Sequence, residues 1–399
     1  MGSSGVTSSH NLPSVGMLSL AASMPDRILT NDYWRENHPE VVAEVEKRLW
    51  MWKPKDSDQG PEEFNQEMAP YVRDPFRGSR ERRWIEPDGS ALKLETEAAR
   101  HALAAAAVAP EQIDLLICSS FVPDVEIYGY SVGGAAHLAR ELGLSNAGWN
   151  LETACSSMLV GFTTACSLIR TGEHHRALVV TSNIYSRLSI PSDPISWGVG
   201  DAATAVVVGP VPAGEGHLGS HCEHTGATCG TINTEVEFDE ENNLPRFRLR
   251  AARSAARVLR DTAPGYLRQC VGEALRKARV ELSDIDFFVF NTPLAWYARF
   301  CARTLGVDLG KTISLYPLYS NLGPTLPGVS LLHAARWGKI RQGDLILLYS
   351  VGSVSSCTAV VMRWGDVALG PLPHDASPEK LEALEADARA AKRKPQELS

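Results

Sequence analysis

The segment Asn150–Gly172, NLETACSSMLVGFTTACSLIRTG, decides how the rest of the chain can be interpreted. A short polar stretch leads to Cys155, and apolar residues then recur at helical spacing as far as Ile169. This pattern predicts a buried helix that begins at or just after Cys155. The free N–H groups and the positive partial charge of a helix start favour a thiolate over a thiol. Cys155 is therefore a candidate nucleophile, although a lone buried cysteine is more often an inert core residue.

The bulk composition bounds the class of protein. The chain has 399 residues, of which 44% are hydrophobic, so it is long enough for more than one core and is not globally disordered. The formal net charge of -8 gives no reason to expect a nucleic-acid partner. No apolar run reaches the length of a membrane span, and the start lacks the pattern of a secretory leader. We expect a cytoplasmic protein without membrane contact.

The cysteines argue against a metal site or a disulfide framework. They lie far apart, and none forms a Cys-x-x-Cys pair, which is typical of a reducing compartment. His221 and His224 flank Cys222, but their spacing fits no common zinc pattern. We expect neither a metal nor a cofactor. The eight cysteines are Cys118, Cys155, Cys166, Cys222, Cys229, Cys270, Cys301 and Cys357.

Composition shifts divide the chain into five predicted parts. Within the N-terminal half, the charged, Trp-containing segment 31–83 reads as an insertion or cap, either an entrance for substrate or a packing flap. The charged C-terminal tail predicts a solvated helix or disorder. The parts are a disordered tail (1–14), an N-terminal half with the candidate nucleophile (15–213), a connection (214–250), a C-terminal half (251–366) and a C-terminal tail (367–399).

The two halves share a pattern of residues. ETEAARHALAAAAVAPEQIDLLICSS in the first half is echoed by APGYLRQCVGEALRKARVELSDIDFFVFN in the second. RALVVTS is echoed by GDLILLYS, and ATAVVVGP by CTAVVMRW. Each piece contains a continuous apolar run of the kind that forms a strand buried on both faces. Three matched pieces in the same order predict an internally duplicated α/β fold.

With these features the chain resembles the thiolase superfamily, and within it the β-ketoacyl-acyl-carrier-protein synthase III group. The resemblance covers roughly Val15 to Trp364. It rests on ETACSSMLVGFTTACSLIRTGEHHRALVVTS around Cys155, on GVGDAATAVVVG, on the Asn-Leu-Gly of YSNLGPTLPGVSLLHAA and on GDLILLYSVGSVSS. These motifs are specific together and in this order. In that context Cys155 is better explained as a nucleophile than as a core residue.

The resemblance implies a fold, a partner and a reaction. It implies a duplicated five-layer α-β-α-β-α thiolase-like fold, a homodimer, and Cys155 at the end of a pantetheine tunnel. An acyl group would pass from an acyl-CoA or acyl carrier protein thioester to Cys155 and then to a second substrate, so the pantetheine compound is a substrate and not a cofactor. The oxyanion at each stage would bind the Cys155 N–H and the N–H of Gly352 or Ser353.

One departure from the family changes the expected chemistry. The family places a histidine and an asparagine opposite the cysteine. The asparagine maps to Asn321, but the histidine position is Asn291, and a second family asparagine is Leu294. An amide can donate a hydrogen bond but cannot act as a general base. Glu152 is a candidate replacement base, and an equally good interpretation is a buried carboxylate bonded to backbone.

We therefore expect an acyltransferase of the ketoacyl synthase III type in fatty-acyl or polyketide-like specialised metabolism, acting without decarboxylation. One alternative is a decarboxylative Claisen-condensing priming ketosynthase in which asparagine replaces histidine. Another is a non-catalytic partner subunit of a synthase heterodimer, which the retention of Cys155 and Asn321 disfavours. Without a histidine, the helix start should be the main activator of Cys155 and should lower its thiol pKa by about one unit.

Overall fold

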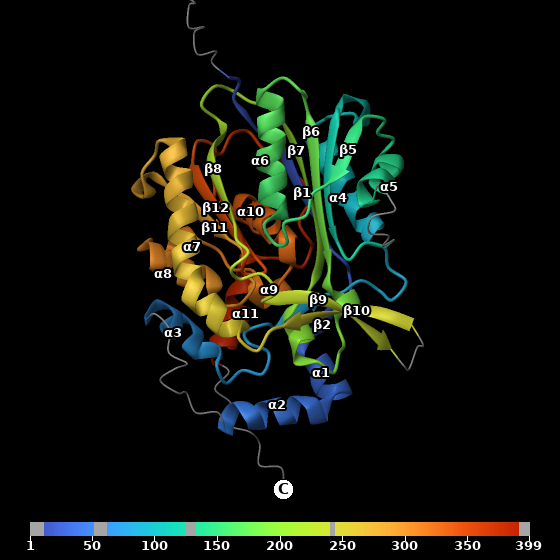
Figure 1. Ribbon diagram of the computed structural model, residues 1–399, viewed down its shortest axis with the longest axis vertical. Coiled ribbons are helices and arrows are strands. Elements are labelled where there is room, and N and C mark those ends of the chain that lie inside the picture. The colour runs from blue at the N-terminus through green and yellow to red at the C-terminus, as the bar shows by residue number, and fades with distance from the viewer. Residues whose placement is uncertain (1–11, 52–61, 125–132, 240–243, 391–399) are drawn as a thin grey trace, which may run out of the picture.

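Two large sheets, with helices between them and on both outer sides, form the body of the protein (Figure 1). The computed structural model describes residues 12–51, 62–124, 133–239 and 244–390. From one side to the other, the layers are α4 (Ala91–Ala105) with α5 (Gly133–Leu142), the first sheet, α6 (Ser157–Arg170) with α10 (Leu326–Arg336), the second sheet, and α7 (Ala255–Ala278) with α8 (Tyr297–Leu305). The predicted five-layer α-β-α-β-α fold is confirmed.

The two sheets repeat one topology. The first has the order β14-β1-β7-β6-β4-β5 and the second the order β11-β12-β13-β8. Read from the opposite end, β8-β13-β12-β11 matches β1-β7-β6-β4, and the parallel and antiparallel pairings agree. The strands are β1 (Val15–Ser23), β4 (Leu115–Phe121), β5 (Ala147–Asn150), β6 (Ala177–Ile184), β7 (Asp201–Pro210), β8 (Gly216–His224), β11 (Phe287–Phe290), β12 (Leu345–Gly352), β13 (Ser356–Arg363) and β14 (Ala368–Leu369).

The position of β8 differs from the predicted domain boundaries. Residues 214–250 were expected to be a connection, but β8 lies inside them and pairs with β13 as a full member of the second sheet. The second unit of the duplication therefore begins at Gly216 and not near residue 251. The polar side chains of this strand concealed it, because its burial alternates only in its first half and its second half is largely exposed.

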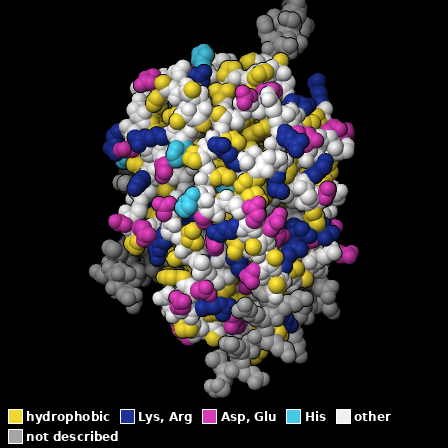
Figure 2. Space-filling view, turned by 180° about the vertical axis from the view of Figure 1, so that it is seen from behind, with side chains coloured by type: hydrophobic (Ala, Val, Ile, Leu, Met, Phe, Trp, Pro, Cys, Tyr) yellow, Lys and Arg dark blue, Asp and Glu magenta, His cyan; other side chains and the backbone are white. Residues whose placement is uncertain are grey.

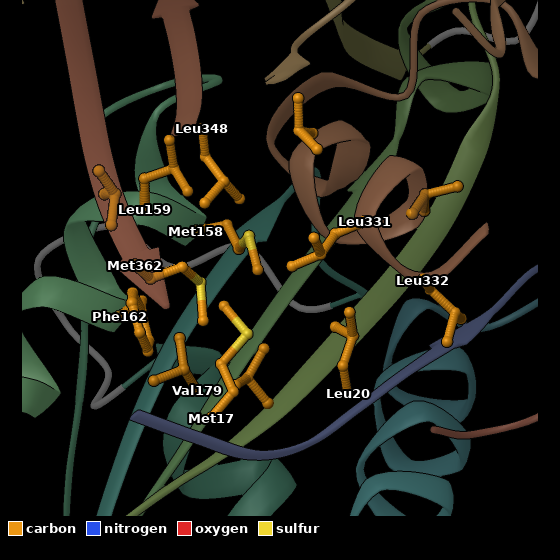
Figure 3. Close-up of a cluster of buried hydrophobic side chains, with 14 of the residues drawn as sticks. Met17, Leu20, Met158, Leu159, Phe162, Val179, Leu331, Leu332, Leu348 and Met362 are labelled. Atoms are coloured by element: carbon orange, nitrogen blue, oxygen red, sulfur yellow. The ribbon is translucent and has the colours of Figure 1, made fainter. Parts of the chain in front are cut away.

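The core between the sheets explains the apolar face of α6. Met158, Leu159 and Phe162 of α6 meet side chains of both sheets and of α10 (Figure 3). The opposite side of α6 carries Thr163, Thr164 and Ser167 and is less buried, so the helix keeps a narrow polar stripe. Its partners in Figure 3 include Met17, Leu20, Val179, Leu331, Leu332, Leu348 and Met362.

The segment 31–83 forms a cap with its own small core, as predicted for an insertion. It contains α1 (Asn31–Asn37), α2 (Pro39–Met51) and α3 (Glu62–Met68), and the two-stranded pair β2 (Ile28–Thr30) and β3 (Glu81–Arg83) lies at its ends. Trp34, Phe76 and Trp84 pack with Trp197 of the first half. The fully buried guanidinium of Arg82 lies over the Trp34 ring, 4.2 Å from its centroid.

The C-terminal tail is a docked helix and not the solvated helix or disordered segment that was predicted. Helix α11 (Pro378–Ala390) buries Leu381 and Ala388. Asp387 accepts a hydrogen bond from Arg80 Nε at 2.6 Å, so the tail is joined to the cap. The disorder predicted for residues 1–14 falls almost wholly on residues 1–11, which lie outside the described residues.

Two smaller elements complete the site described below. Strands β9 (Ile232–Asp239) and β10 (Leu244–Ala251) form a hairpin, and α9 (Tyr316–Tyr319) precedes Asn321.

On the face seen in Figure 2, side chains of both charges are interspersed and do not gather in a patch of one sign. In the described part of the chain, no helix combines the length and the apolar character that crossing a bilayer requires.

Candidate active site

Cys155 lies in a tight turn between β5 and α6, just before the helix starts, as predicted. The preceding residue, Ala154, has the left-handed φ of 52°, which is unfavourable for a residue with a Cβ. The turn is fixed by Ser157, whose Oγ accepts a hydrogen bond from Thr153 N and donates one to Ala154 O, both at 2.8 Å. Ser350 Oγ donates to Cys155 O at 2.6 Å. The nucleophile is therefore held by backbone strain and local hydrogen bonds.

The turn at the end of β12, formed by Gly352, Ser353 and Val354, lies against Cys155. Ser353 and Val354 have left-handed φ values of 47° and 63°, and this turn directs the Ser353 N–H at the Cys155 sulfur. The Cys155 N–H is directed at the same sulfur. The structure thus brings together the Cys155 and Ser353 N–H donors, while Gly352 is the residue that permits the close approach.

Tyr185 supplies a side-chain donor that sequence analysis missed. Its hydroxyl lies near the sulfur of Cys155, close enough to favour the thiolate. Tyr185 follows the last residue of β6, and its ring meets Phe121 edge-on with centroids 5.3 Å apart. One signal could have found it: in α/β folds, residues just beyond the carboxyl ends of buried strands gather at the site.

Burial raises the pKa of the Cys155 thiol to about 11, against the predicted lowering. The Tyr185 hydroxyl and the Ser353 N–H favour the thiolate, but they do not outweigh the loss of water around the sulfur. The start of α6 carries no acidic or basic side chain that would change this balance, and Ser156 makes no side-chain cap there. At neutral pH the resting group is a thiol.

Asn321 faces the cavity beside Cys155. Its backbone is fixed on both sides, because Asn321 N donates to Gly198 O and Gly200 N donates to Asn321 O, each at 3.0 Å. Its Oδ1 accepts the Gly323 N–H at 2.8 Å. This contact orients the amide, so that Nδ2 remains as a donor for a bound ligand.

Asn291 does not share this position. It is fully buried and is not part of the cavity wall. Its Nδ2 donates to Val351 O at 3.1 Å, and Val351 N donates to its Oδ1 at 3.2 Å. A side-chain amide has a donor and an acceptor that match the C=O and N–H of the backbone. The two bonds therefore engage the Asn291 amide with Val351. The expected second amide opposite the sulfur is replaced by the Tyr185 hydroxyl, while Leu294 contributes an apolar wall.

Glu152 makes the hydrogen bonds of its second predicted interpretation, but the residue is partly exposed and not the buried carboxylate that was expected. Its carboxylate accepts hydrogen bonds from Ser119 Oγ at 2.9 Å and from Ser120 N at 3.1 Å. Burial, with the negative charge of Glu95 in addition, raises the pKa of Glu152 to about 7. Glu152 is not among the residues that line the cavity with Cys155, so its geometry offers no path to the sulfur.

The cavity that contains Cys155 has a volume of about 290 Å³ and a mainly apolar wall. The cap contributes Pro75, Phe76 and Arg77, which supports its interpretation as part of the substrate entrance. The hairpin contributes Ile232, Leu249 and Ala251. The remaining lining residues are Tyr185, Pro194, Ile195, Trp197, Gly198, Val199, Leu259, Pro293, Leu294, Tyr316, Asn321, Val351, Ser353 and Val354.

No histidine or carboxylate appears in this wall, as far as the described residues define it. His333, which follows Asn321 in the chain, is fully buried in α10. Its ring nitrogens bond Val329 O at 2.8 Å and the Tyr319 hydroxyl at 3.0 Å. The described residues also contain no cluster of three or more His, Cys, Asp or Glu side chains that could hold a metal ion.

Known family models match both halves of the chain. Residues 149–226 match the family described as 3-Oxoacyl-[acyl-carrier-protein (ACP)] synthase III, and residues 275–364 match its C-terminal family. The first match contains Cys155 and Tyr185. The second contains Asn291, Asn321 and the turn formed by Gly352, Ser353 and Val354.

Curated relatives and solved structures agree with these matches. The chain is 28% identical over 284 residues to a beta-ketoacyl-[acyl-carrier-protein] synthase III of Microcystis aeruginosa, covering 69% of this chain and 84% of that protein. It is 27% identical over 306 residues to the same enzyme of Desulfitobacterium hafniense, covering 72% and 87%.

Among solved structures, FabH of Pseudomonas aeruginosa superposes with a TM-score of 0.70 at 20% identity, covering 88% of this chain and 98% of that one. A structure of Xanthomonas campestris OleA with bound lauric acid and lauroyl-CoA gives a TM-score of 0.69 at 19% identity, covering 88% and 100%. The fold and the site thus define a protein of the thiolase superfamily. Within it, the chain is similar to 3-oxoacyl-ACP synthase III over both matched segments, residues 149–226 and 275–364.

Proposed function

We propose that this protein is an acyltransferase that carries an acyl group on Cys155 and passes it to an acceptor without decarboxylation. The observation that carries the proposal is the position of the Cys155 sulfur: it opens into an apolar cavity and meets the Ser353 N–H and the Tyr185 hydroxyl. The donor is an acyl-CoA or acyl carrier protein thioester, in keeping with the names of the relatives. The setting is fatty-acyl or polyketide-like specialised metabolism.

Loading of the enzyme needs no net base. The Cys155 sulfur bonds to the acyl carbon, the bond from that carbon to the donor sulfur breaks, and the thiol proton ends on the departing donor thiol. The tetrahedral oxyanion needs preorganised donors, and the Cys155 N–H, the Ser353 N–H and the free Nδ2 of Asn321 are available. Removal of one such donor typically costs 10²–10³ in turnover.

The cavity wall favours transfer without decarboxylation. A priming ketosynthase uses a histidine opposite the cysteine, and here that position, Asn291, is closed by its two bonds to Val351. The second candidate function remains a decarboxylative priming ketosynthase, which the names of the curated relatives favour. In that case Asn321 and Tyr185 would have to stabilise the enolate without the imidazole.

The proposal includes a cytoplasmic homodimer. Strand β5 is the edge of the first sheet and leads directly to Cys155. Its Trp149 is 37% exposed, an unusual exposure for a large apolar ring. Exposed edge strands pair readily with a second copy, so this edge supports the homodimer. Light scattering at micromolar concentration tests it, and a monomer mass would contradict it.

Intact mass spectrometry tests the acyl-enzyme. The protein is mixed with acetyl-, butyryl-, hexanoyl- and octanoyl-CoA, and the adduct is located by peptide mapping. Wild type should gain one acyl mass on Cys155, and Cys155→Ala should gain none. The exposed Cys229 gives a matched control, since Cys229→Ser should label like wild type. Labelling that persists in Cys155→Ala would refute the assignment.

A second measurement separates the two candidate functions. The loaded enzyme is mixed with malonyl-CoA, and carbon dioxide and β-ketoacyl products are measured. We expect neither product above the level of Cys155→Ala. Release of carbon dioxide with formation of a carbon–carbon bond would establish the priming ketosynthase instead.

A further inference from the structure

The hydroxyl of Tyr185 is placed on the reacting sulfur by packing. Tyr185 and Cys155 line the same cavity, and the hydroxyl lies close enough to the sulfur to favour its thiolate. The ring is confined by Phe121 on one side and by Gly323 on the other, where an added Cβ would come within 3.2 Å of Tyr185 Cε2. Ser189 Oγ donates to Tyr185 O at 2.8 Å and fixes the turn. A ring confined on two sides, on a backbone fixed by a third contact, keeps its hydroxyl in one place.

Few other charged groups act on this pair. Among the described residues, Cys155 is the only titratable group that acts on Tyr185. Cys155 in turn is influenced by Tyr185 and by the N–H groups of Ser353 and of Cys155 itself. Burial and the neighbouring sulfur raise the pKa of Tyr185 well above its usual value, so the phenol stays protonated over the whole working range of pH. It can give a proton only if it receives one in return.

We propose that the Tyr185 hydroxyl relays a proton from the acceptor to Cys155 Sγ as the acyl group leaves, and that the acceptor is therefore a hydroxyl, amine or thiol compound. This inference rests on the proposed function. It assigns to Tyr185 a catalytic role in the place that the family gives to a histidine, and it names the acceptor by its chemistry.

The relay balances without an external acid or base. The acceptor heteroatom forms a bond to the acyl carbon, the bond from that carbon to Sγ breaks, and its electron pair stays on sulfur. Tyr185 gives its proton to Sγ and takes the acceptor's proton on its oxygen. The products are a thiol, a neutral phenol and the acylated acceptor.

A decarboxylating carbon acceptor does not fit this arrangement. Loss of carbon dioxide supplies a carbanion but no proton, so Cys155 would be left as a thiolate. Because burial raises the thiol pKa to about 11, that thiolate is a poor leaving group unless a proton follows it. Tyr316 and Arg77 also line the described cavity wall, but neither is among the groups that act on Cys155.

Rapid mixing of the loaded full-length enzyme tests the relay. Butyryl-loaded enzyme is freed of excess butyryl-CoA and mixed with N-acetylcysteamine, benzylamine or benzyl alcohol, and loss of the acyl mass is followed. Tyr185→Phe keeps the ring but lacks the hydroxyl. A hydrogen bond to a charged group is lost, so discharge should slow by about 10- to 100-fold. Loading should slow less, by about 3- to 10-fold, because a more basic thiolate is also a better nucleophile.

The unequal effect on the two steps is the diagnostic result. A merely structural role would change loading and discharge together. Tyr266→Phe, on α7 and outside the cavity, is the matched control and should leave both rates unchanged. If Tyr185→Phe fails to fold, as judged by thermal unfolding, 3-fluorotyrosine at position 185 keeps the shape and makes the phenol more acidic. The relay then predicts a discharge rate that changes with the acidity of the phenol.

Two outcomes would overturn the inference while leaving the acyl-enzyme intact. One is discharge from Tyr185→Phe at the wild-type rate, or from the fluorotyrosine enzyme with no dependence on phenol acidity. The other is wild-type transfer to malonyl-CoA with none to the three heteroatom acceptors. Failure of wild type to load at Cys155 is a different result, and it would refute the proposed function itself.

Discussion

Gly352 and Cys155 lie so close that a Cβ on Gly352 would stand 2.7 Å from Cys155 N. The same Cβ would stand 2.9 Å from Thr153 O. Both contacts are with backbone, which cannot move aside without changing the nucleophile turn. The glycine therefore sets the distance between the Ser353 N–H and the sulfur.

Gly352→Ala should accordingly separate the oxyanion donors from Cys155. Misplacement by about 1 Å can cost roughly 100-fold in rate, and overpacking costs about 1–3 kcal/mol of stability. We expect loading by butyryl-CoA to fall at least by that factor while the protein still folds. Gly143→Ala is a control for conformational cost, because Gly143 has a positive φ but nothing within 4 Å of its added Cβ. Loading of Gly352→Ala at the wild-type rate would contradict this role.

The pH profile of loading tests the state of the thiol. With the thiol pKa raised to about 11, the thiolate fraction grows about tenfold for each unit of pH below that value. The loading rate should rise throughout pH 7–9 without a plateau, when chemistry is shown to limit it. A plateau near neutral pH would mean that a group other than those described here activates Cys155.

The two asparagines should respond differently to substitution. Asn291→Ala leaves both peptide groups of buried Val351 without partners, at about 1–3 kcal/mol each. It should lower the melting temperature clearly. Asn321→Ala should change stability little and reduce acyl loading by about 10²–10³ if its Nδ2 binds the oxyanion. Denaturant unfolding and acyl-loading assays on both variants measure the two effects. An Asn291→Ala protein that is stable but does not load would contradict the structural role of Asn291.

Acid should destabilise the protein through His333. Burial lowers its pKa to about 4 in the fold, below the unfolded value near 6.5, so the unfolded state binds more protons between these limits. The stability contribution is present above pH 6.5 and is lost as pH falls toward 4, by about 3 kcal/mol at most. Urea unfolding at pH 7 and pH 4.5 measures the loss. His333→Gln should show a smaller loss, and an equal loss would point to other buried groups such as His217.

The C-terminal helix should control the cap and not the chemistry. Arg80 is joined to Asp387 by its Nε at 2.6 Å and to Asp74 by its Nη1 at 2.9 Å, while Asp74 accepts the N–H groups of Phe76 and Gly78. A chain ending at residue 376 should therefore loosen the cap wall. We expect a higher KM for butyryl-CoA with kcat within a few-fold of wild type. A lost kcat at unchanged KM would contradict this. Asp387→Asn should change stability by at most about 1 kcal/mol, because that carboxylate is exposed.

Local patterns predicted the layers and the position of Cys155 just before a helix, but not the side chains around its sulfur. Apolar periodicity located α6 and the buried strands, because each buries apolar side chains in the core. The pairing of Asn291 with Val351 could not be predicted, since it joins the Asn291 side chain to a backbone 60 positions away. The direction of the Cys155 pKa shift depends on desolvation by the cavity wall, whose parts come from the cap, the hairpin and both halves.

The link between Arg80 and Asp387 also sets an order of assembly during synthesis. The two residues are 307 positions apart. At roughly 5–20 residues per second, the ribosome reaches Asp387 about 15–60 seconds after Arg80. During that interval the nascent cap lacks its last anchor, and the apolar wall around Cys155 is open to chaperones and to other nascent chains. The cap wall beside Cys155 is thus complete only after helix α11 has left the ribosome.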